Sequence, residues 1–411
     1  MFLIAKRNIK MTNRLRLLDI RIRNYPLFEE KIDFSLLTSS CVARDKADSL
    51  NHLYGNNYTN NLTTIVGKNA TGKTTIMKLE MGILYLLFGN KSISETGLNE
   101  VLFDNSTVDF DIFLYGTDSI LIKDELSISQ VINNEQPEFV ISKEKIYTKK
   151  ALLSESKKNL LNFKKSKLVL DRNNLKPEVS SILSPDDSLF KSLISSHKYQ
   201  APRITDNTIF TNPNRSVSNL GNVPTEILNY LDSSIEYLKK ETIEGSGTNQ
   251  VFFRLKFKGQ REISDGSFSV INSYLSSGTT KGISLYTQIL STLKDGGIIF
   301  VDEIENHFNH AITRTFLNYF KDPFININNA KLIFTTHYPE FLDDLDRNDQ
   351  IYIARRFDKI SLTRYSSAKV RSDILKSDVF MSSTISGTAP EYDAYMDLKK
   401  ATIKSIKEFK R

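Results

Sequence analysis

The stretch Gly67-Lys68-Asn69-Ala70-Thr71-Gly72-Lys73-Thr74 decides the fold of this chain, because it fits the pattern G-x-x-x-x-G-K-[ST]. The residues before it, Leu62–Val66, are apolar or β-branched and predict a short buried strand. The residues after it, Thr75–Phe88, predict a helix. Gly67 and Gly72 allow the backbone to curl so that successive N–H groups point inward. A strand, a glycine-bounded loop and a helix in this order predict a phosphate-binding loop.

A loop of this kind binds the phosphates of a nucleotide together with a magnesium ion. The helix that follows directs the positive end of its dipole at the phosphates. We expect Lys73 to contact the β- and γ-phosphates and the Thr74 hydroxyl to bind Mg²⁺. The alternative is a glycine loop that merely turns the chain, and the flanking strand and helix disfavour it. The residues predicted to bind the nucleotide are Gly67, Lys68, Asn69, Ala70, Thr71, Gly72, Lys73, Thr74 and Thr75.

A second segment supplies paired carboxylates after an apolar run. Ile298–Val301 has no polar alternation, which is typical of a buried parallel strand, and Asp302 and Glu303 follow it directly. Ligands in an open α/β sheet bind at the carboxyl ends of such strands. We expect Asp302 to hold Mg²⁺ through water and Glu303 to act as the general base toward the attacking water. The alternative is an exposed turn, since pairs of acidic residues after a strand are common.

A third segment, Lys331–Thr336, repeats this pattern and ends in His337. The histidine comes 337 − 302 = 35 residues after Asp302, which leaves room for one helix and a return strand. We therefore expect His337 beside the γ-phosphate, where it would orient the water. A single histidine at a strand end is more often structural, and only its position in the chain favours the catalytic interpretation.

A loop rich in hydroxyl groups precedes the acidic strand. Ser276, Ser277 and Gly278 lie just before the helix-like run Ile283–Leu293. Small polar residues at a helix N-terminus can form a second anion site. Taken alone the segment is ordinary turn and cap chemistry.

Together these segments resemble the ABC-type ATPase heads, in which a phosphate loop, a signature loop, an acidic strand and a switch histidine occur. The Gly-Lys-Asn start of the loop, with Asn69, looks like the branch of the chromosome-maintenance and overcoming-lysogenization-defect (OLD) proteins. Asp302–Phe308, Thr335–Leu342 and Leu15–Asn24 are similar to that branch as well.

Three positions depart from the pattern of the family. Ala70 replaces a glycine that many relatives have, and Ser277 stands where the transporter signature has its first glycine. The glutamine of the usual Q-loop is not evident, and Gln130 is a candidate only by default.

The resemblance implies a fold, a cofactor and an assembly. The fold is an α/β ABC-type P-loop NTPase head with a mixed or parallel sheet, an antiparallel β lobe and a helical insertion. The catalytic residues would be Glu303, His337 and Lys73, with ATP and Mg²⁺ as cofactors. In such heads the signature loop completes the site of a second subunit, so Ser276 and Gly278 would touch the γ-phosphate bound by the partner of an ATP-sandwiched homodimer.

The chain divides into three predicted ranges. Residues 1–149 form the first half of the head, 150–248 the helical insertion, and 249–411 the second half. Alternation of apolar and polar residues predicts a hairpin over Thr107–Ile128. Further expected elements are strands at Phe139–Ser142 and Val251–Phe257, a helix over Thr225–Lys240, and edge strands at Gln350–Ala354 and Ile360–Arg364.

Composition agrees with a soluble intracellular protein, so we expect a cytoplasmic location. The chain has 411 residues and one cysteine, Cys41, which excludes an intramolecular disulfide. The longest uncharged apolar run, Met81–Phe88, is too short to cross a bilayer. The opening segment, Met1–Met11, has no proper apolar core or cleavage site, so we expect no signal peptide.

The net charge of +7 permits nucleic-acid contact without requiring it. Nine lysines fall between Lys143 and Lys167, among apolar residues whose spacing suits an amphipathic helix with a basic face. The face is either simply solvated or tracks a DNA or RNA backbone. The nine are Lys143, Lys145, Lys149, Lys150, Lys157, Lys158, Lys164, Lys165 and Lys167.

Two functions remain open. The first is the ATPase of a bacterial antiphage, abortive-infection system that regulates a separate effector such as a nuclease or toxin. It is favoured by the OLD-like motifs, the compact insertion and the expectation that the effector is a separate chain. The second is a DNA-repair or chromosome-maintenance ATPase that clamps DNA directly. The basic window favours it, and the lack of sustained heptads counts against it. The motif variants do not fit a membrane transporter.

Overall fold

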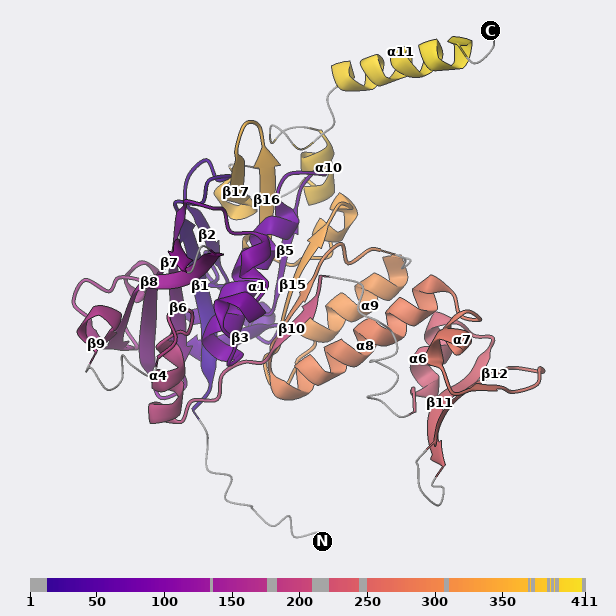
Figure 1. Cartoon of the computed structure of the whole chain (residues 1–411), viewed down its shortest axis with the longest axis horizontal. Helices are drawn as coiled ribbons and strands as arrows, with labels where there is room; N and C mark the ends of the chain where they lie inside the picture. Colours follow the sequence, from indigo (N-terminus) through magenta and orange to yellow (C-terminus); the bar gives the residue numbers. More distant parts are fainter. Residues whose placement is uncertain are drawn as a thin grey trace.

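The computed structural model describes residues 13–133, 136–175, 183–208, 222–243, 250–306, 310–368, 370, 374–382, 385, 388 and 392–408 (Figure 1). Met1–Met11 and the last two residues of the Asp302–Phe308 match lie outside these ranges. No helix of the described part is both long enough and apolar enough to cross a membrane.

A mixed six-stranded sheet forms the centre of the molecule, with the strand order β10-β14-β15-β5-β16-β17. All neighbouring strands are parallel except β16 and β17, which are antiparallel. Every residue of β5, β14 and β15 is buried, which explains the apolar runs without alternation. The strands span Ile204–Asn207 (β10), Ile298–Val301 (β14), Lys331–Thr336 (β15), Leu62–Val66 (β5), Ile351–Arg356 (β16) and Ile360–Arg364 (β17).

Two hydrophobic cores lie on the two faces of this sheet, because successive side chains of a strand point to opposite faces. Ile298 and Phe300 pack in the core shared with α1 (Lys73–Phe88), whereas Ile299 and Val301 pack in the core shared with α8 (Ser277–Asp295) and α9 (His310–Lys321). Figure 1 accordingly shows α1 between the central sheet and the antiparallel lobe, with α8 and α9 on the other side.

The predicted antiparallel lobe is a second six-stranded sheet, ordered β2-β1-β6-β7-β8-β9. The predicted hairpin over Thr107–Ile128 is confirmed as β6 and β7, and the predicted strand Phe139–Ser142 is a part of the longer β8. The strands span Leu15–Arg23 (β1), Ile32–Ser35 (β2), Thr107–Gly116 (β6), Ile120–Asn133 (β7), Gln136–Lys150 (β8) and Lys167–Asp171 (β9). A small hairpin of β3 (Leu50–Tyr54) and β4 (Asn57–Asn60) adjoins the lobe.

The expectation of a helical insertion over 150–248 is wrong for the described part of that range. Its helices are short: α2 (Lys157–Leu160), α4 (Phe190–His197) and α6 (Thr225–Leu231). They alternate with strands, of which β9 extends the antiparallel lobe and β10 forms an edge of the central sheet. The ranges 1–149, 150–248 and 249–411 remain a prediction as domain boundaries.

The predicted helix Thr225–Lys240 in fact ends at Leu231 and is followed by β11 (Ile235–Ile243). Asp232 ends it, because its carboxylate accepts hydrogen bonds from the backbone and the hydroxyl of Ser234 and so stabilises a turn. Ile235 and Leu238 are then buried by pairing with β12. The helical spacing of apolar residues across this boundary was therefore misleading.

The predicted strand Val251–Phe257 is confirmed as β12 (Gln250–Phe257), but it does not return to the central sheet. It lies between β11 and β13 (Ile263–Asp265) in a separate three-stranded sheet, next to α7 (Phe268–Asn272). Of the two predicted edge strands, β17 is at the edge and β16 lies inside the central sheet.

The predicted basic helix over Lys143–Lys167 is also wrong. Lys143, Lys145, Lys149 and Lys150 lie on β8, whose side chains alternate between two faces of the lobe. Lys145 pairs with Asp171, and Lys149 pairs with Glu155 and donates to two backbone carbonyls. The nine lysines are therefore dispersed over β8, α2, β9 and the loops between them instead of sharing one helical face.

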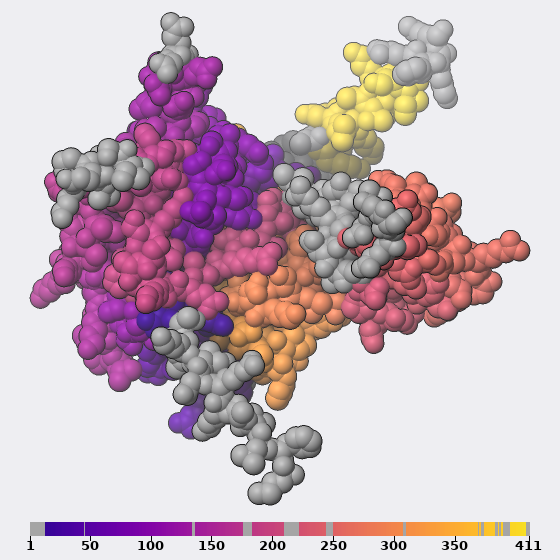
Figure 2. Space-filling view, turned by 60° about the horizontal axis from the view of Figure 1, so that its bottom comes forward, coloured from indigo at the N-terminus to yellow at the C-terminus, as the bar shows by residue number. Residues whose placement is uncertain are grey.

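The C-terminal helices are α10 (Lys376–Met381) and α11 (Tyr392–Glu408). Figures 1 and 2 both show α11 projecting away from the rest of the molecule. Seven 3₁₀ turns complete the described elements: Arg44–Lys46, Ile93–Glu95, Leu98–Glu100, Arg172–Asn174, Pro339–Leu342, Asn348–Gln350 and Tyr365–Ser367.

Candidate functional site

The loop between β5 and α1 has the shape that its glycines predict. Gly72 has φ +87°, and a Cβ there would lie 2.4 Å from Cδ1 of Ile360. A Cβ on Gly67 would lie 2.4 Å from the backbone oxygen of Ala354, so neither position accepts a side chain. Ala70 also has a positive φ, 63°, which a glycine would adopt at lower cost.

The ammonium of Lys73 is held inside the loop. Its Nζ donates to the backbone oxygens of Gly67 (2.9 Å) and Lys68 (3.0 Å). Burial lowers the pKa of Lys73 to about 8, although the carboxylates of Asp302, Glu303 and Glu305 act to raise it. Negatively charged phosphate oxygens would stabilise the charged form further, so the position suits an anionic ligand.

Thr74 and Asp302 meet at the carboxyl ends of β5 and β14. The Thr74 hydroxyl donates to one Asp302 oxygen at 2.7 Å, and the Thr335 hydroxyl donates to the other at 2.5 Å. A hydroxyl and a carboxylate are the hard oxygen ligands that Mg²⁺ uses, with phosphate oxygens and water filling the remaining positions. No cluster of three or more acidic, histidine or cysteine ligands occurs among the described residues. The pair therefore fits a magnesium ion bound jointly with phosphates.

Glu303 has a backbone conformation that directs its carboxylate toward the loop. Its φ is +48°, unusual for a residue with a side chain, and its N–H donates to the Thr335 hydroxyl at 2.7 Å. The carboxylate accepts hydrogen bonds from Nε2 of His337 (3.0 Å) and Nδ2 of Asn306 (2.6 Å). Partial burial raises the pKa of Glu303, but these bonds and the charge of Lys73 outweigh it, so the pKa is lowered. Glu303 is thus held as a carboxylate.

His337 lies between the lysine and the glutamate. Its Nδ1 is 3.3 Å from Nζ of Lys73, and its Nε2 is 3.0 Å from Oε1 of Glu303. Its backbone N–H donates to Glu305 at 2.6 Å. This arrangement fits the tautomer with hydrogen on Nε2, and it connects the phosphate-binding loop to Glu303 through one ring.

Ser276, Ser277 and Gly278 are not near this loop. Ser276 caps α8 by accepting a hydrogen bond from the backbone of Thr279 at 3.0 Å, as the sequence predicted for a helix N-terminus. The two serines are exposed. None of the three residues lines the cavity of about 360 Å³ that the phosphate-binding loop forms with Glu303 and His337. Their predicted contact with the nucleotide of a second subunit stays a prediction.

The fold brings to the site several residues that no motif of the sequence indicated. Leu27, Arg356 and Ile360 line the same cavity. Leu27 lies at the site because its backbone oxygen accepts a hydrogen bond from the backbone N–H of Ile360. No local sequence pattern predicts that pairing. Thr335 could have been found, since it follows the apolar run Leu332–Phe334 and lies two residues before His337.

A smaller cavity of about 150 Å³ also has Glu303 in its lining. It is lined by Lys281 of α8, by Asn207 and Thr208 at the end of β10, and by Asp302 and Glu303. Gln130 is elsewhere: it lies on β7, where its amide bonds with Asp104 and Asn105. The backbone oxygen of Asn207 accepts a hydrogen bond from the N–H of Asp302 at 3.4 Å. Asn207 is therefore a polar residue beside the acidic strand.

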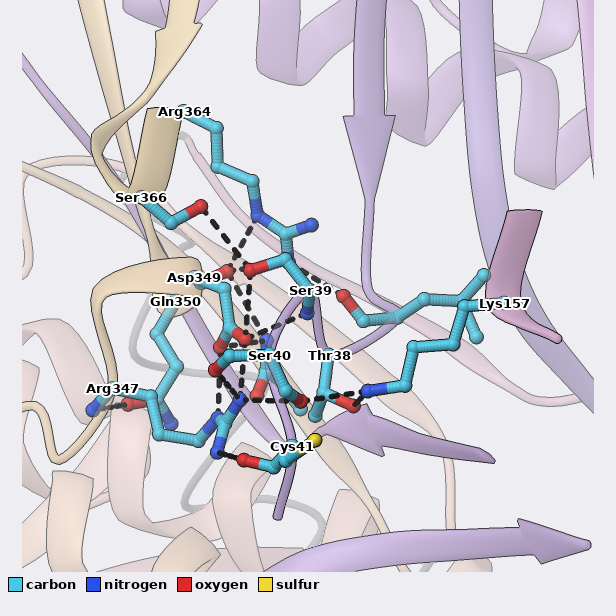
Figure 3. Close-up of polar contacts among 12 residues, drawn as sticks. Thr38, Ser39, Ser40, Cys41, Lys157, Arg347, Asp349, Gln350, Arg364 and Ser366 are labelled. Atoms are coloured by element: carbon cyan, nitrogen blue, oxygen red, sulfur yellow. Dashed lines mark hydrogen bonds and ion pairs between the residues drawn. The ribbon is translucent and has the colours of Figure 1, made fainter. Parts of the chain in front are cut away.

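A second polar cluster, around Arg347 and Asp349, does not form a comparable candidate binding site. Figure 3 shows Arg347 and Asp349 facing Thr38–Cys41, with Arg364 and Lys157 beside them. Arg347 binds both oxygens of Asp349 at 2.9 and 2.6 Å, and Asp349 also accepts from the backbone of Ser39. Its charged groups bond to one another and to backbone oxygens, which indicates a structural role.

Comparison with known proteins completes the description. Residues 62–343, more than half of the chain, match the family described as "AAA domain, putative AbiEii toxin, Type IV TA system". Among solved structures, the SMC head domain from Thermotoga maritima has 10% identity and a TM-score of 0.41, over 86% of this chain and 100% of that one. The recombination mediator RecF with ATP has 11% identity and a TM-score of 0.40, over 87% and 100%. The search of curated proteins finds no match.

Proposed function

The chain belongs to this AAA-domain family, and from that premise we propose that it binds and hydrolyses ATP with Mg²⁺ as an ABC-type ATPase. The observation that carries the proposal is the path of hydrogen bonds from Lys73 through His337 to Glu303, beside the Thr74–Asp302 pair. A phosphate anchor, a pair of metal ligands and a general base are the parts that phosphoryl transfer to water requires, and these residues lie beside one another here.

Each residue has a separate task in this proposal. Lys73 and the loop N–H groups bind the phosphates, and Thr74 and Asp302 hold the metal ion, which would neutralise charge on the leaving oxygens. Glu303 takes a proton from the attacking water, while His337 fixes the direction of its carboxylate.

Turnover of ATP by two variants tests the ATPase. We expect Lys73→Ala to lose nucleotide binding, and Glu303→Gln to bind ATP while its turnover falls by about 10²–10⁴-fold. The matched control is Lys78→Ala, a lysine of the same helix that pairs with Glu100 outside the cavity. Phosphate release at the wild-type rate from Lys73→Ala would refute the assignment of this site.

The proposed assembly is a two-fold dimer that closes on ATP. It is supported by the exposure of Ser276 and Ser277 at the start of α8, which leaves them accessible to an isologous contact with a second copy. Light scattering on Glu303→Gln tests it. With ATP the mass should double from 46.9 kDa, whereas a monomer at saturating ATP would refute the sandwich.

The proposed role is control of a separate effector in antiphage, abortive-infection defence, and the toxin named in the family description supports it. Purification of Glu303→Gln from its native host with ATP present tests this role. A stoichiometric nuclease, toxin or modifying enzyme would identify the effector. Nucleic acid without a partner protein would instead favour the alternative, a DNA-repair or chromosome-maintenance clamp.

That alternative has one observation in its favour. Lys143 and Lys150 are exposed on β8, and Lys158, Lys164 and Lys165 are exposed on the segment that joins β8 to β9. Contacts of these lysines with phosphates would make binding fall steeply with salt. Turnover stimulated by DNA at low salt, and lost when these lysines are replaced by glutamine, would support the clamp.

A further inference from the structure

One edge of the antiparallel lobe is covered only in part. β8 pairs with β7 over its whole length, but on its other side β9 pairs only with Lys145–Thr148. Among the described residues, no strand pairs with that side of β8 before Lys145. A cavity of about 330 Å³ lies along this part, and Pro137–Val140 line it. An uncovered strand edge presents N–H and C=O groups with which another chain can pair.

The backbone of Phe139 faces away from β7, on the uncovered side. The N–H of Ile141 donates to the backbone oxygen of Pro185 at 2.9 Å, so the polar backbone groups of Ile141 point away from β7. Every second residue of a strand directs these groups to the same side, and Phe139 and Pro137 therefore follow Ile141. Pro137 has no N–H to donate, which agrees with a position on the outer side of an edge strand. No described residue outside β7 bonds to the N–H or C=O of Phe139, so both groups are left for a partner.

The wall opposite this edge is held in place by hydrogen bonds. Arg172 donates to the backbone oxygens of Ser184 and Pro185 at 3.0 and 3.1 Å. The backbone oxygen of Asp186 accepts from the N–H of Ile93 at 3.2 Å. An incoming segment therefore meets a surface that is already formed, which lowers the entropic cost of binding.

The side chains along the edge define what it could bind. Phe139 packs against the core of the lobe, and Ile93, which also lines the cavity, belongs to that core. Glu138 points to the opposite face of the sheet and is exposed. Glu138 and Asp186 are the charged residues among the described lining, which includes no lysine, arginine or histidine. The cavity thus combines an apolar side with negative charge.

We propose that the edge Pro137–Val140 binds an extended segment of another protein by strand addition. An apolar residue of that segment exchanges backbone hydrogen bonds with Phe139, and its side chain packs on the side of the cavity that Ile93 lines. The residue beside it is lysine or arginine, which complements the charge of Glu138. The edge shares no lining residue with the cavity at the phosphate-binding loop, so the inference does not depend on the proposed ATPase.

A fluorescein-labelled peptide, Thr-Lys-Val-Lys-Thr, is the probe for the full-length protein, because its two lysines place one beside Glu138 in either strand direction. We expect saturable binding by fluorescence anisotropy. The hydrogen exchange of the Phe139 N–H, followed by mass spectrometry, should slow about tenfold or more. N-methylation of the valine removes one N–H and keeps every side chain, so the affinity should fall about tenfold.

A charge exchange tests the chemistry of the partner. Glu138→Lys should weaken binding of the lysine peptide about tenfold and favour a peptide with glutamate in place of lysine. The matched control is Asp48→Lys, an exposed acid before β3 that does not line the cavity and should leave binding unchanged.

Three results would overturn the proposal. The first is an absence of saturable binding to the wild type. The second is equal affinity for the N-methylated peptide, or for the lysine peptide in Glu138→Lys. The third is slow exchange at Phe139 before peptide is added, which would show that this chain or a second copy already covers the edge.

Discussion

At the scale of single residues, the Thr335 hydroxyl holds two parts of the site. It donates to Asp302 and accepts from the N–H of Glu303, and the residue is fully buried. The metal ligand and the general base are therefore fixed relative to each other by one oxygen atom. Misplacement of a catalytic group by about 1 Å can cost 10²-fold in rate. We therefore expect the loss of this one hydroxyl to lower the rate of ATP turnover strongly.

Replacement of Thr335 by valine keeps the shape and removes the hydroxyl. We expect turnover to fall by about 10²-fold and the free energy of unfolding to fall by about 1–3 kcal/mol, because a buried N–H loses its partner. ATPase rates and urea denaturation measure the two effects. The control is Thr63→Val on β5, where the buried hydroxyl has no hydrogen-bond partner among the described residues and its loss should cost neither activity nor stability. Equal behaviour of the two variants would contradict the role of Thr335.

At the scale of elements, helix α1 carries a buried acid that the site does not use. Glu80 is completely buried, and neither of its carboxyl oxygens has a hydrogen-bond partner among the described residues. Burial raises the pKa of Glu80 well above its ordinary value. The folded protein therefore keeps this carboxyl neutral at pH values at which the unfolded chain has lost the proton.

The free energy of unfolding of the wild type should consequently carry a pH dependence that Glu80→Gln lacks. An acid with a raised folded pKa contributes its full stability below the unfolded pKa and loses it as pH rises toward the folded pKa. Above the unfolded pKa, the stability of Glu80→Gln relative to wild type should rise by about 1.4 kcal/mol per pH unit until the pH approaches the folded pKa. Urea denaturation at several pH values measures it. Glu100→Gln, an exposed carboxylate paired with Lys78, should show no such trend.

At the scale of the whole molecule, the Arg347–Asp349 cluster joins distant parts of the chain. Asp349 binds Ser39 and Arg347, and Arg364 donates to the backbone of Leu37 at 2.7 Å, so residues more than 300 positions apart are held together. Burial raises the pKa of Asp349, but the hydrogen bond and charge of Arg347 outweigh it and the pKa is lowered. The cluster thus connects the start of the head with its last strands.

Asp349→Asn should destabilise the protein by about 3–5 kcal/mol at neutral pH, because the buried guanidinium of Arg347 loses its counter-charge. A carboxylate with a lowered pKa contributes stability above its unfolded pKa and loses it as pH falls. The difference in the free energy of unfolding between Asp349→Asn and wild type should therefore become smaller below about pH 4. Chemical denaturation at neutral and acid pH measures this. Asp346→Asn, which removes a partly exposed ion pair with Lys321, should cost less than about 1 kcal/mol. Equal losses of unfolding free energy in the two variants would mean that burial does not set the contribution of Asp349 to stability.

The sequence by itself determined the elements whose signals are local. The phosphate-binding loop, the strands before Asp302 and His337, and the hairpin Thr107–Ile128 follow from turn chemistry and from the apolar pattern of the strands. These signals extend over one loop or one strand, so no distant contact is needed to recognise them. The AAA-domain family match agrees with what they indicated about the fold.

Only the tertiary structure decided which distant segments meet. The segment 150–248 supplies strands to both large sheets, and neither its lysine pattern nor the apolar spacing over Thr225–Lys240 revealed this. Leu27, Asn207, Lys281 and Arg356 reach the site through strand pairing and helix packing. Such contacts depend on long-range burial, which overrides local propensity and leaves no pattern at the residues themselves.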